Sequence, residues 1–465
     1  MIEPGLFKVE CLSPVHIGSG DELVRGIDFY TSEGFTEVLD PDRVLKTFGA
    51  FEGFAENIRR GVGIGEFLKG RAVQAAACRR YHVPGAIEAH SLRAAIRCGD
   101  GRPLIPGSSI KGALRTLLLA GWSGEGAPHS GRRPPPVRDA LWTVGYSGKT
   151  SSRRLEEAVF HFSGEGLRAN DPKTDLLRTL TVSDAMFAAG SLQVISALAL
   201  GTTRNTLTAA EALERGAGAL VSLRAGDEFL DARLPFPNKL PDLQTLASWS
   251  HLQARHLLDG DLEFFKARNE DPIVGRLEEL LAEVEHAAAS AIILRLGWGT
   301  GWRTMTGDLL TPDERSRVMR RVGKTRKVII EGHSSRGRPS DALGWVRIEP
   351  VSPDEAAALA AATRPAPIEI EPEPAPMPVA AAPAPAPQPL ARRDPFAAAI
   401  ADLKARDWGR VSGYVKQAAS HPDPQERERR LSLIAEQLIR IFGNDRKRIR
   451  EIAQMQELAP FLKGR

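Results

Sequence analysis

Hydrophobic and polar positions follow two different periods along the first 360 residues, which predicts both strands and helices. Short apolar or alternating runs predict strands over residues 6–12, 35–39, 191–200 and 291–296. Apolar residues three and four positions apart predict helices over residues 42–48, 110–120, 207–215 and 272–289. Short strands interleaved with single helices favour an α+β fold class built from ferredoxin-like units, each with one open sheet face.

The composition changes after residue 360. Residues 365–389 contain ten prolines among Ala and Glu and no aromatic residue, which predicts an extended linker. Beyond it, apolar residues at helical spacing predict a helix over 425–442, and a second helix is predicted over 446–457. We therefore expect ferredoxin-like units over 1–175 and 176–360, a Pro/Ala-rich linker over 361–394 and a basic α-helical module over 395–465. The Gly-, Pro- and Arg-rich stretch 123–138 is predicted to be an irregular surface loop.

Charge and cysteine content narrow the class of protein. The net charge of +4 and the pI near 9.0 permit an acidic partner without requiring one, so any nucleic-acid contact must come from local clusters of the 62 Lys and Arg. Three cysteines without a C-x-x-C pair fit a reducing compartment. No signal peptide is apparent, and the apolar runs are too short to span a membrane, so we expect a cytoplasmic protein with no membrane contact.

Four segments rich in glycine or basic residues carry the candidate chemistry. A Gly-Ser-Ser turn before a helix offers backbone N–H groups, hydroxyls and the positive end of the helix dipole to a phosphate, and nearby cations supply charge. Lys111 and Arg115 are four residues apart and share one helical face. The candidate contacts are His16, Gly18 and Ser19 in residues 12–20; Gly107, Ser108, Ser109, Lys111 and Arg115 in residues 105–115; Gly297, Gly299, Gly301 and Arg303 in residues 297–303; and Lys324, Arg326 and Lys327 in residues 324–327.

Each segment also has a purely structural interpretation. A Pro-Gly-Ser-Ser turn is often only a helix start, and 324–327 fits a solvated loop. Trp298 and Trp302 are of a type that fills cores more often than it stacks on bases. A histidine beside a glycine turn, such as His16, is more often packed than catalytic. The occurrence of four such segments in one chain favours the functional interpretation.

Known catalytic patterns are largely missing. Gly148-Lys149-Thr150 and Gly323-Lys324-Thr325 lack the upstream glycine of a phosphate-binding P-loop. The ten histidines show no zinc-ligand spacing, and no G-x-S-x-G nucleophile motif occurs. Asp21, Asp28, Asp40 and Asp184 are potential metal ligands, but their spacing is equally typical of turn and cap residues.

The order and identity of these segments resemble the RAMP superfamily, specifically the family of fifth subunits of the type III-A CRISPR Csm effector complex. The resemblance lies in residues 12–23, the Asp-rich hairpin at 28–40, the Pro-Gly-Ser-Ser segment at 105–115, Val182-Ser183-Asp184, the glycine-rich loop at 297–301, and 324–327 followed by Gly344-Trp345-Val346. It covers residues 1 to about 350. The long loop at 123–138 and the linker with its helical module depart from the family pattern.

The resemblance implies two fused ferredoxin-like units and a non-catalytic subunit that caps the backbone filament and holds the 3′ part of the CRISPR RNA. It implies a role in guide maturation or assembly and in antiviral defence, with no cofactor or bound metal. The partners it implies are the CRISPR RNA, backbone RAMP subunits and a small helical subunit, with target RNA nearby. On this interpretation, reversing the charges of Lys111 and Arg115 abolishes retention of the guide.

Two alternatives to RNA retention remain for the body of the chain. It could be a RAMP-type endoribonuclease that processes the guide precursor, with His16 as general base or with Asp21 or Asp184 holding a metal. It could also be chiefly a protein–protein cap, with RNA held by its neighbours. Residues 401–465 carry a net charge of +5, so the helical module could bind RNA or a protein partner, or be dispensable.

Overall fold

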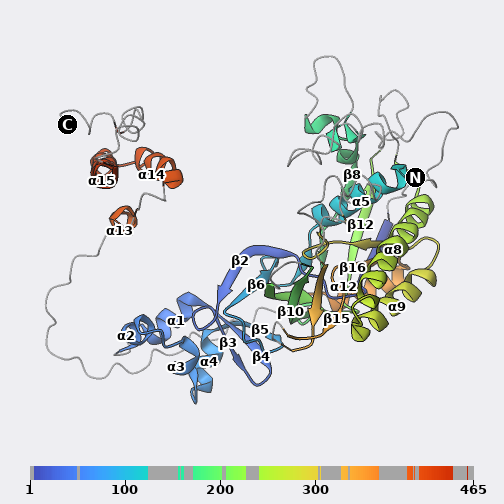
Figure 1. The fold of residues 1–465 in the computed structure, drawn as a ribbon, viewed down its shortest axis with the longest axis horizontal. Helices are drawn as coiled ribbons and strands as arrows, with labels where there is room; N and C mark the ends of the chain where they lie inside the picture. Colours follow the sequence, from blue (N-terminus) through green and yellow to red (C-terminus); the bar gives the residue numbers. More distant parts are fainter. Residues whose placement is uncertain are drawn as a thin grey trace. The chain divides into compact units, whose positions relative to one another are not determined.

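The computed structural model describes two compact units, residues 1–378 and 379–465. Within them it describes residues 5–49, 53–123, 156–157, 159–161, 171–201, 206–226, 240–301, 304, 326–332, 336–365, 395–401, 403, 408–442 and 458. The first unit combines several sheets with helices, which confirms the predicted α+β class (Figure 1). None of the described helices combines the length and apolar character that crossing a bilayer requires.

Sheet A has five antiparallel strands. Their order is β13 (Ile292–Arg295), β16 (Trp345–Pro350), β1 (Gly5–Cys11), β12 (Gly218–Ala225) and β8 (Leu180–Val182). Alternation along β1 buries Phe7, Val9 and Cys11, as expected for a strand with one face on the core. Helices α8 (Leu243–Lys266) and α9 (Asp271–Glu285) lie beside one another at the β13 edge (Figure 1).

Sheet B has six strands. Their order is β15 (Pro339–Asp341), β14 (Arg326–Ile330), β10 (Leu192–Leu200), β11 (Thr206–Leu213), β6 (Ser91–Ala95) and β2 (Gly18–Val24). Only β11 and β6 run parallel. Both sheets take strands from either side of residue 175, so the division into two ferredoxin-like units at 175–176 stays a prediction.

A smaller lobe, residues 29–84, has a three-stranded sheet and four short helices. These elements are β3 (Phe29–Ser32), β4 (Phe35–Leu39), α1 (Pro41–Phe48), α2 (Phe54–Arg59), α3 (Ile64–Leu68), α4 (Ala72–Cys78) and β5 (Arg79–Pro84). Phe48, Phe54 and Leu68 belong to a core of its own. The lobe lies at the end of the unit opposite α8 and α9 (Figure 1).

The remaining elements of the first unit connect the sheets. They are β7 (Leu104–Ile105), α5 (Gly107–Ser123), the 3-10 turns η1 (Pro172–Thr174) and η2 (Leu176–Thr179), β9 (Ala185–Met186) and α12 (Pro353–Ala362). Helix α5 buries Ile110, Leu114 and Leu117 in the main hydrophobic core, which also takes Val9 from β1. Helix α12 starts with a capping box. The Ser352 hydroxyl accepts from the Glu355 N–H, and the Glu355 carboxylate accepts from the Ser352 N–H.

Most predicted elements agree with the structure, but the helix predicted over 207–215 is wrong. Residues Thr206–Leu213 form β11, paired between β10 and β6, and Ala209, Ala210 and Ala212 are buried. Alanine and Glu211 favour a helix locally, but burial on both faces of a central strand overrides that preference. Helix α8 was not predicted.

The second unit contains α13 (Pro395–Ala401), α14 (Trp408–Ala419) and α15 (Pro424–Phe442). Helix α15 matches the helix predicted over 425–442, and Leu431, Ile434 and Leu438 are buried in a core with Val415. The predicted helix over 446–457, most of the loop 123–138 and linker residues 366–394 lie outside the described residues.

Candidate nucleic-acid interface

Three of the four candidate segments meet at one place, where the turn before β2 packs on the glycine-rich loop, residues 297–301. The backbone N–H of Trp298 donates to the carbonyl of His16 (2.8 Å). The N–H of Gly344 donates to the carbonyl of Pro14 (2.9 Å), and that of Leu296 donates to Gly344 (2.8 Å). Residues far apart in sequence are therefore joined by main-chain hydrogen bonds.

Two glycines of the loop are required by packing. Gly297 has φ +82°, and a Cβ there would lie 2.7 Å from the His16 carbonyl oxygen. Gly299 has φ +102°, and its Cβ would lie 3.1 Å from the Leu343 side chain. A Cβ on Gly301, at φ +71°, would meet open space. Gly297 and Gly299 thus allow close approach of protein to protein, and only Gly301 borders free space.

His16 is buried beneath this loop. Its Nδ1 is 2.6 Å from the carbonyl oxygen of Glu211, and a Cβ on Gly18 would lie 3.1 Å from its Nε2. Burial lowers the pKa of His16, and the charge of Arg93 lowers it further, although the hydrogen bond to Glu211 opposes both. The imidazole is therefore neutral near pH 7, with Nδ1–H donating to Glu211.

Trp298 packs on sheet B, and the side chains of Arg93 and Lys327 contact its ring. The edge of the His16 ring meets it at 5.7 Å between centroids, with an interplanar angle of 89°. The Nζ of Lys327 lies 4.4 Å and the Cζ of Arg93 lies 5.4 Å from the ring centroid. Burial, and then the charge of Arg93, lowers the pKa of Lys327. These are cation–π distances.

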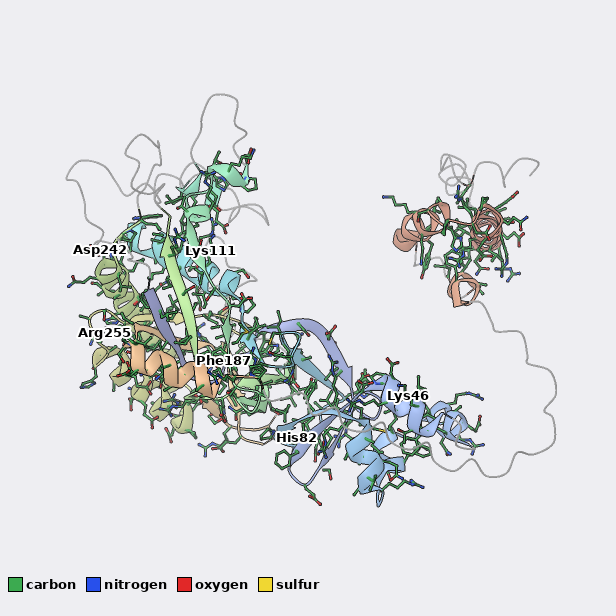
Figure 2. All side chains as sticks on the ribbon, turned by 180° about the vertical axis from the view of Figure 1, so that it is seen from behind. Lys46, His82, Lys111, Phe187, Asp242 and Arg255 are labelled. Carbon is green, nitrogen blue, oxygen red and sulfur yellow. The ribbon has the colours of Figure 1, made fainter. Side chains whose placement is uncertain are left out.

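The two cations of α5 have different surroundings. Arg115 pairs with Asp175 (2.6 Å) and lies over Phe160. Lys111 has no ion pair with any described residue, and burial lowers its pKa more than Asp175 raises it. Figure 2 shows Lys111 on the main body, away from His82 of the smaller lobe. Lys111 is thus the α5 cation available to a ligand.

The start of α5 is fixed by Asp184. The N–H of Gly107 donates to Asp184 Oδ1 (2.7 Å), and a Cβ at Gly107 would collide with the carbonyl of Val182. Ser108 is exposed and Ser109 is half-buried. The helix start therefore presents Ser108 to solvent while Asp184 occupies one of its N–H donors.

The fourth segment is only partly described. Arg326 is buried and pairs with Asp261, which also receives Arg295 Nη1 at 3.0 Å. Lys327 is the one described residue of this segment that reaches Trp298. Trp302, Arg303 and Lys324 lie outside the described residues.

The candidate metal ligands serve local structure. Asp28 accepts from the Val24 N–H (2.8 Å), and Asp40 caps α1 by accepting from Asp42 and Arg43. Asp21 is exposed and accepts from Ser19 Oγ (3.1 Å). No group of three His, Cys, Asp or Glu side chains within the described part of the chain is arranged to hold a metal ion.

Two small neighbouring cavities lie near the glycine-rich loop and α5. Each has a volume of about 20 Å³, and they share Leu257, Arg295 and Thr304. One reaches Gly299, Gly301 and Lys327, and the other reaches Ala113 and Thr116 of α5. Helix α5, which begins in the segment 105–115, thus adjoins the same part of the core.

Comparisons with known proteins agree with this architecture. A family model of the RAMP superfamily matches residues 8–304. A chain of a Csm–crRNA–target RNA ternary complex of a type III-A CRISPR-Cas system superposes with a TM-score of 0.53 at 22% identity, covering 75% of this chain and 100% of that one. T. onnurineus Csm5 superposes with a TM-score of 0.51 at 22% identity, covering 73% of this chain and 99% of that one. No curated protein sequence matches the chain. The solved structures share its fold.

Proposed function

The chain belongs to the RAMP superfamily, and from this premise we propose that it is a non-catalytic RNA-binding subunit of a type III-A CRISPR ribonucleoprotein. In this role it caps the backbone filament and holds the 3′ part of the CRISPR RNA. Backbone RAMP subunits and a small helical subunit are its protein partners. The resemblance of its fold to a chain in a Csm–crRNA–target RNA complex supports this assignment.

The observation that carries the proposal is the junction of the 12–18 turn, the glycine-rich loop and Lys327 around Trp298. Main-chain hydrogen bonds fix this junction, and its cations lie at the surface of sheet B. Cations near a glycine that borders open space suit a phosphodiester chain. Lys111 and Ser108 of α5 add a second place for a phosphate.

The surroundings of the residues considered for catalysis favour holding RNA over cutting it. His16 is 2% exposed, and one ring nitrogen is engaged by Glu211. Asp184 is engaged by the start of α5. A general base must reach the proton that it abstracts, which a side chain buried beneath the glycine-rich loop does poorly.

Co-purification tests the proposal. A tagged copy, expressed with its effector genes and a guide array, is expected to retain guide RNA of defined length together with backbone subunits. The purified chain is expected to bind single-stranded RNA with an affinity that falls steeply as salt rises. An assembled complex that keeps its full guide without this chain, and a chain that binds no RNA at low salt, would contradict the proposal.

Incubation with labelled guide precursor tests the enzymatic alternative. We expect no specific cleavage with or without divalent metal. Cleavage that His16→Ala removes would establish the endoribonuclease instead.

A further inference from the structure

Arg93 has no glycine-rich or basic motif around it, yet it shares the Trp298 ring with Lys327. Arg93 lies on β6 and Lys327 on β14, with β10 and β11 between these strands. The Cζ of Arg93 and the Nζ of Lys327 lie 5.4 Å and 4.4 Å from the ring centroid. One indole therefore brings together two cations from strands that are not neighbours.

The register of sheet B and the small side chains on its central strands allow both cations to reach Trp298. In register, Arg93 is opposite Ala210 and Lys327 is opposite Ala199. Trp298 packs on a patch formed by Ile195, Ala197, Ala210, Ala212 and Leu343. The central strands carry alanine at these positions, so the indole packs on small side chains, and the longer side chains of Arg93 and Lys327 reach it from the flanking strands.

The positive charge at this place has no acidic partner among the described residues. The cross-strand neighbour of Arg93 is Glu22, which accepts instead from Ser91 Oγ at 2.5 Å. The buried His16 ring also lies beside Trp298, and the charge of Arg93 disfavours the charged forms of both His16 and Lys327. Arg115 and Arg326, by contrast, are each paired with an aspartate.

Two cations that contact one ring, neither of them paired with a described carboxylate, favour binding of an anion, because a bound anion offsets their mutual repulsion. The guanidinium offers two parallel donors to a phosphate, and the ammonium acts as a point charge beside it. The indole, contacted by two cations and by the edge of His16, holds these groups in place.

We propose that Arg93 and Lys327, held by Trp298, bind one backbone phosphate of single-stranded RNA. This site rests on the proposed function and adds Arg93, which lies outside the RAMP-like motifs, to the RNA-contacting residues. Its ligand is the phosphodiester, so recognition is independent of base identity.

The test measures binding of the full-length chain to a fluorescently labelled 12-nucleotide polyuridine RNA by anisotropy at several salt concentrations. Arg93→Gln, Lys327→Met and the double variant are compared with wild type. We expect each single variant to weaken binding by roughly ten-fold at low salt, the cost of about 1.4 kcal/mol. The double variant should lower the slope of log affinity against log salt by about 0.7, which corresponds to one lost phosphate contact on a single strand.

Lys266→Gln is the matched control, because Lys266 is exposed and pairs with Glu278 instead of contacting Trp298. It should leave affinity and slope unchanged. Thermal melting gives a second readout: removal of either unpaired cation should not lower the melting temperature. If Lys327→Met fails to fold, Arg93→Gln alone decides, since Arg93 is exposed.

The outcomes separate the two proposals. Wild-type binding with an unchanged slope in the double variant overturns this phosphate site and leaves the proposed function standing. No binding by the wild-type chain at low salt overturns both. Thermal stabilisation by inorganic phosphate that both substitutions remove, without any change in RNA binding, assigns the site to a free anion and also overturns the proposal.

Discussion

His16 gives the chain a measurable dependence of stability on pH. Burial lowers its pKa in the folded state, so the unfolded chain takes up a proton first as the pH falls. The free energy of unfolding contributed by this group is therefore complete above the unfolded pKa of about 6.5 and declines below it, by up to about 1.4 kcal/mol per pH unit. Urea denaturation of RNA-free protein at pH 7.5, 6.5 and 5.5 measures this decline.

His16→Asn is the control, since its amide N–H replaces the donor to the Glu211 carbonyl without titrating. All other histidines are common to both proteins. The difference in unfolding free energy between wild type and variant should shrink as the pH falls. Two curves that stay parallel from pH 7.5 to 5.5 would show that His16 protonates equally well in the folded state.

The glycine-rich loop offers a matched pair of substitutions. Gly301→Ala places a Cβ in open space and costs only the strain of a left-handed residue, about 1–2 kcal/mol. Gly297→Ala meets the same strain and in addition pushes a Cβ against the His16 carbonyl, so it should cost about 1–3 kcal/mol more. Chemical denaturation of both variants checks the order, and equal losses would show that the loop yields freely.

At the scale of elements, α5 separates a binding cation from a structural one. Lys111→Glu should weaken RNA binding and lower the free energy of unfolding less than Arg115→Glu does, because Lys111 makes no ion pair with a described residue and interacts with Asp175 only as a nearby charge. Arg115→Glu places a third carboxylate beside Asp175 and Glu156. It should cost roughly 2 kcal/mol or more, below the about 3–5 kcal/mol of a fully buried pair, because about a fifth of each side chain is exposed.

Anisotropy and denaturation are measured on both single variants. Of the two charge reversals that the sequence pairs, Lys111→Glu would thus act mainly on RNA binding and Arg115→Glu mainly on stability. Equal effects on stability would contradict the assignment of Arg115 to the fold. RNA binding that survives Lys111→Glu unchanged would remove α5 from the interface.

Local patterns predicted strands with strong alternation, but they misjudged β11. Its sequence is rich in alanine, and only its place between β10 and β6 makes it a strand. Glu211 shows why this is hard to foresee: a fully buried carboxylate accepts from the Ala95 N–H at 2.8 Å and pairs with Arg97 at 3.2 Å. Both partners lie more than 100 residues away in the chain.

The segments of the candidate site could be predicted from the sequence, but the ion pairs of their side chains could not. Glycine turns identify backbone that must approach closely, so His16, Gly297 and Lys327 were found as members of segments that do meet. Whether a cation forms an ion pair depends on residues that are distant in the sequence. The sequence therefore could not distinguish Arg326, which pairs with Asp261, from Lys327, which contacts Trp298. Arg93 was missed because β6 is five residues long and carries no turn signal.

At the scale of the whole molecule, the candidate site depends on chain crossings between the two large sheets. The 12–18 turn leads from β1 of sheet A to β2 of sheet B, and the glycine-rich loop follows β13 of sheet A. Strands of both sheets therefore determine where Trp298 lies. Damage to either sheet should therefore affect RNA binding.

The second unit has a hydrophobic core of its own. The core of α13–α15 consists of residues between Phe396 and Leu458, and the clusters of the first unit contain none of them. Deleting residues 379–465 should therefore leave the melting temperature of the first unit within about 1 °C, less than the roughly 2–4 °C that 1 kcal/mol gives in a domain of 150–250 residues. A larger drop would mean that the first unit depends on the helical module. The same deletion tests whether the module binds RNA, because removing the net charge of +5 over 401–465 lowers the salt dependence of RNA binding only if those cations contact the RNA.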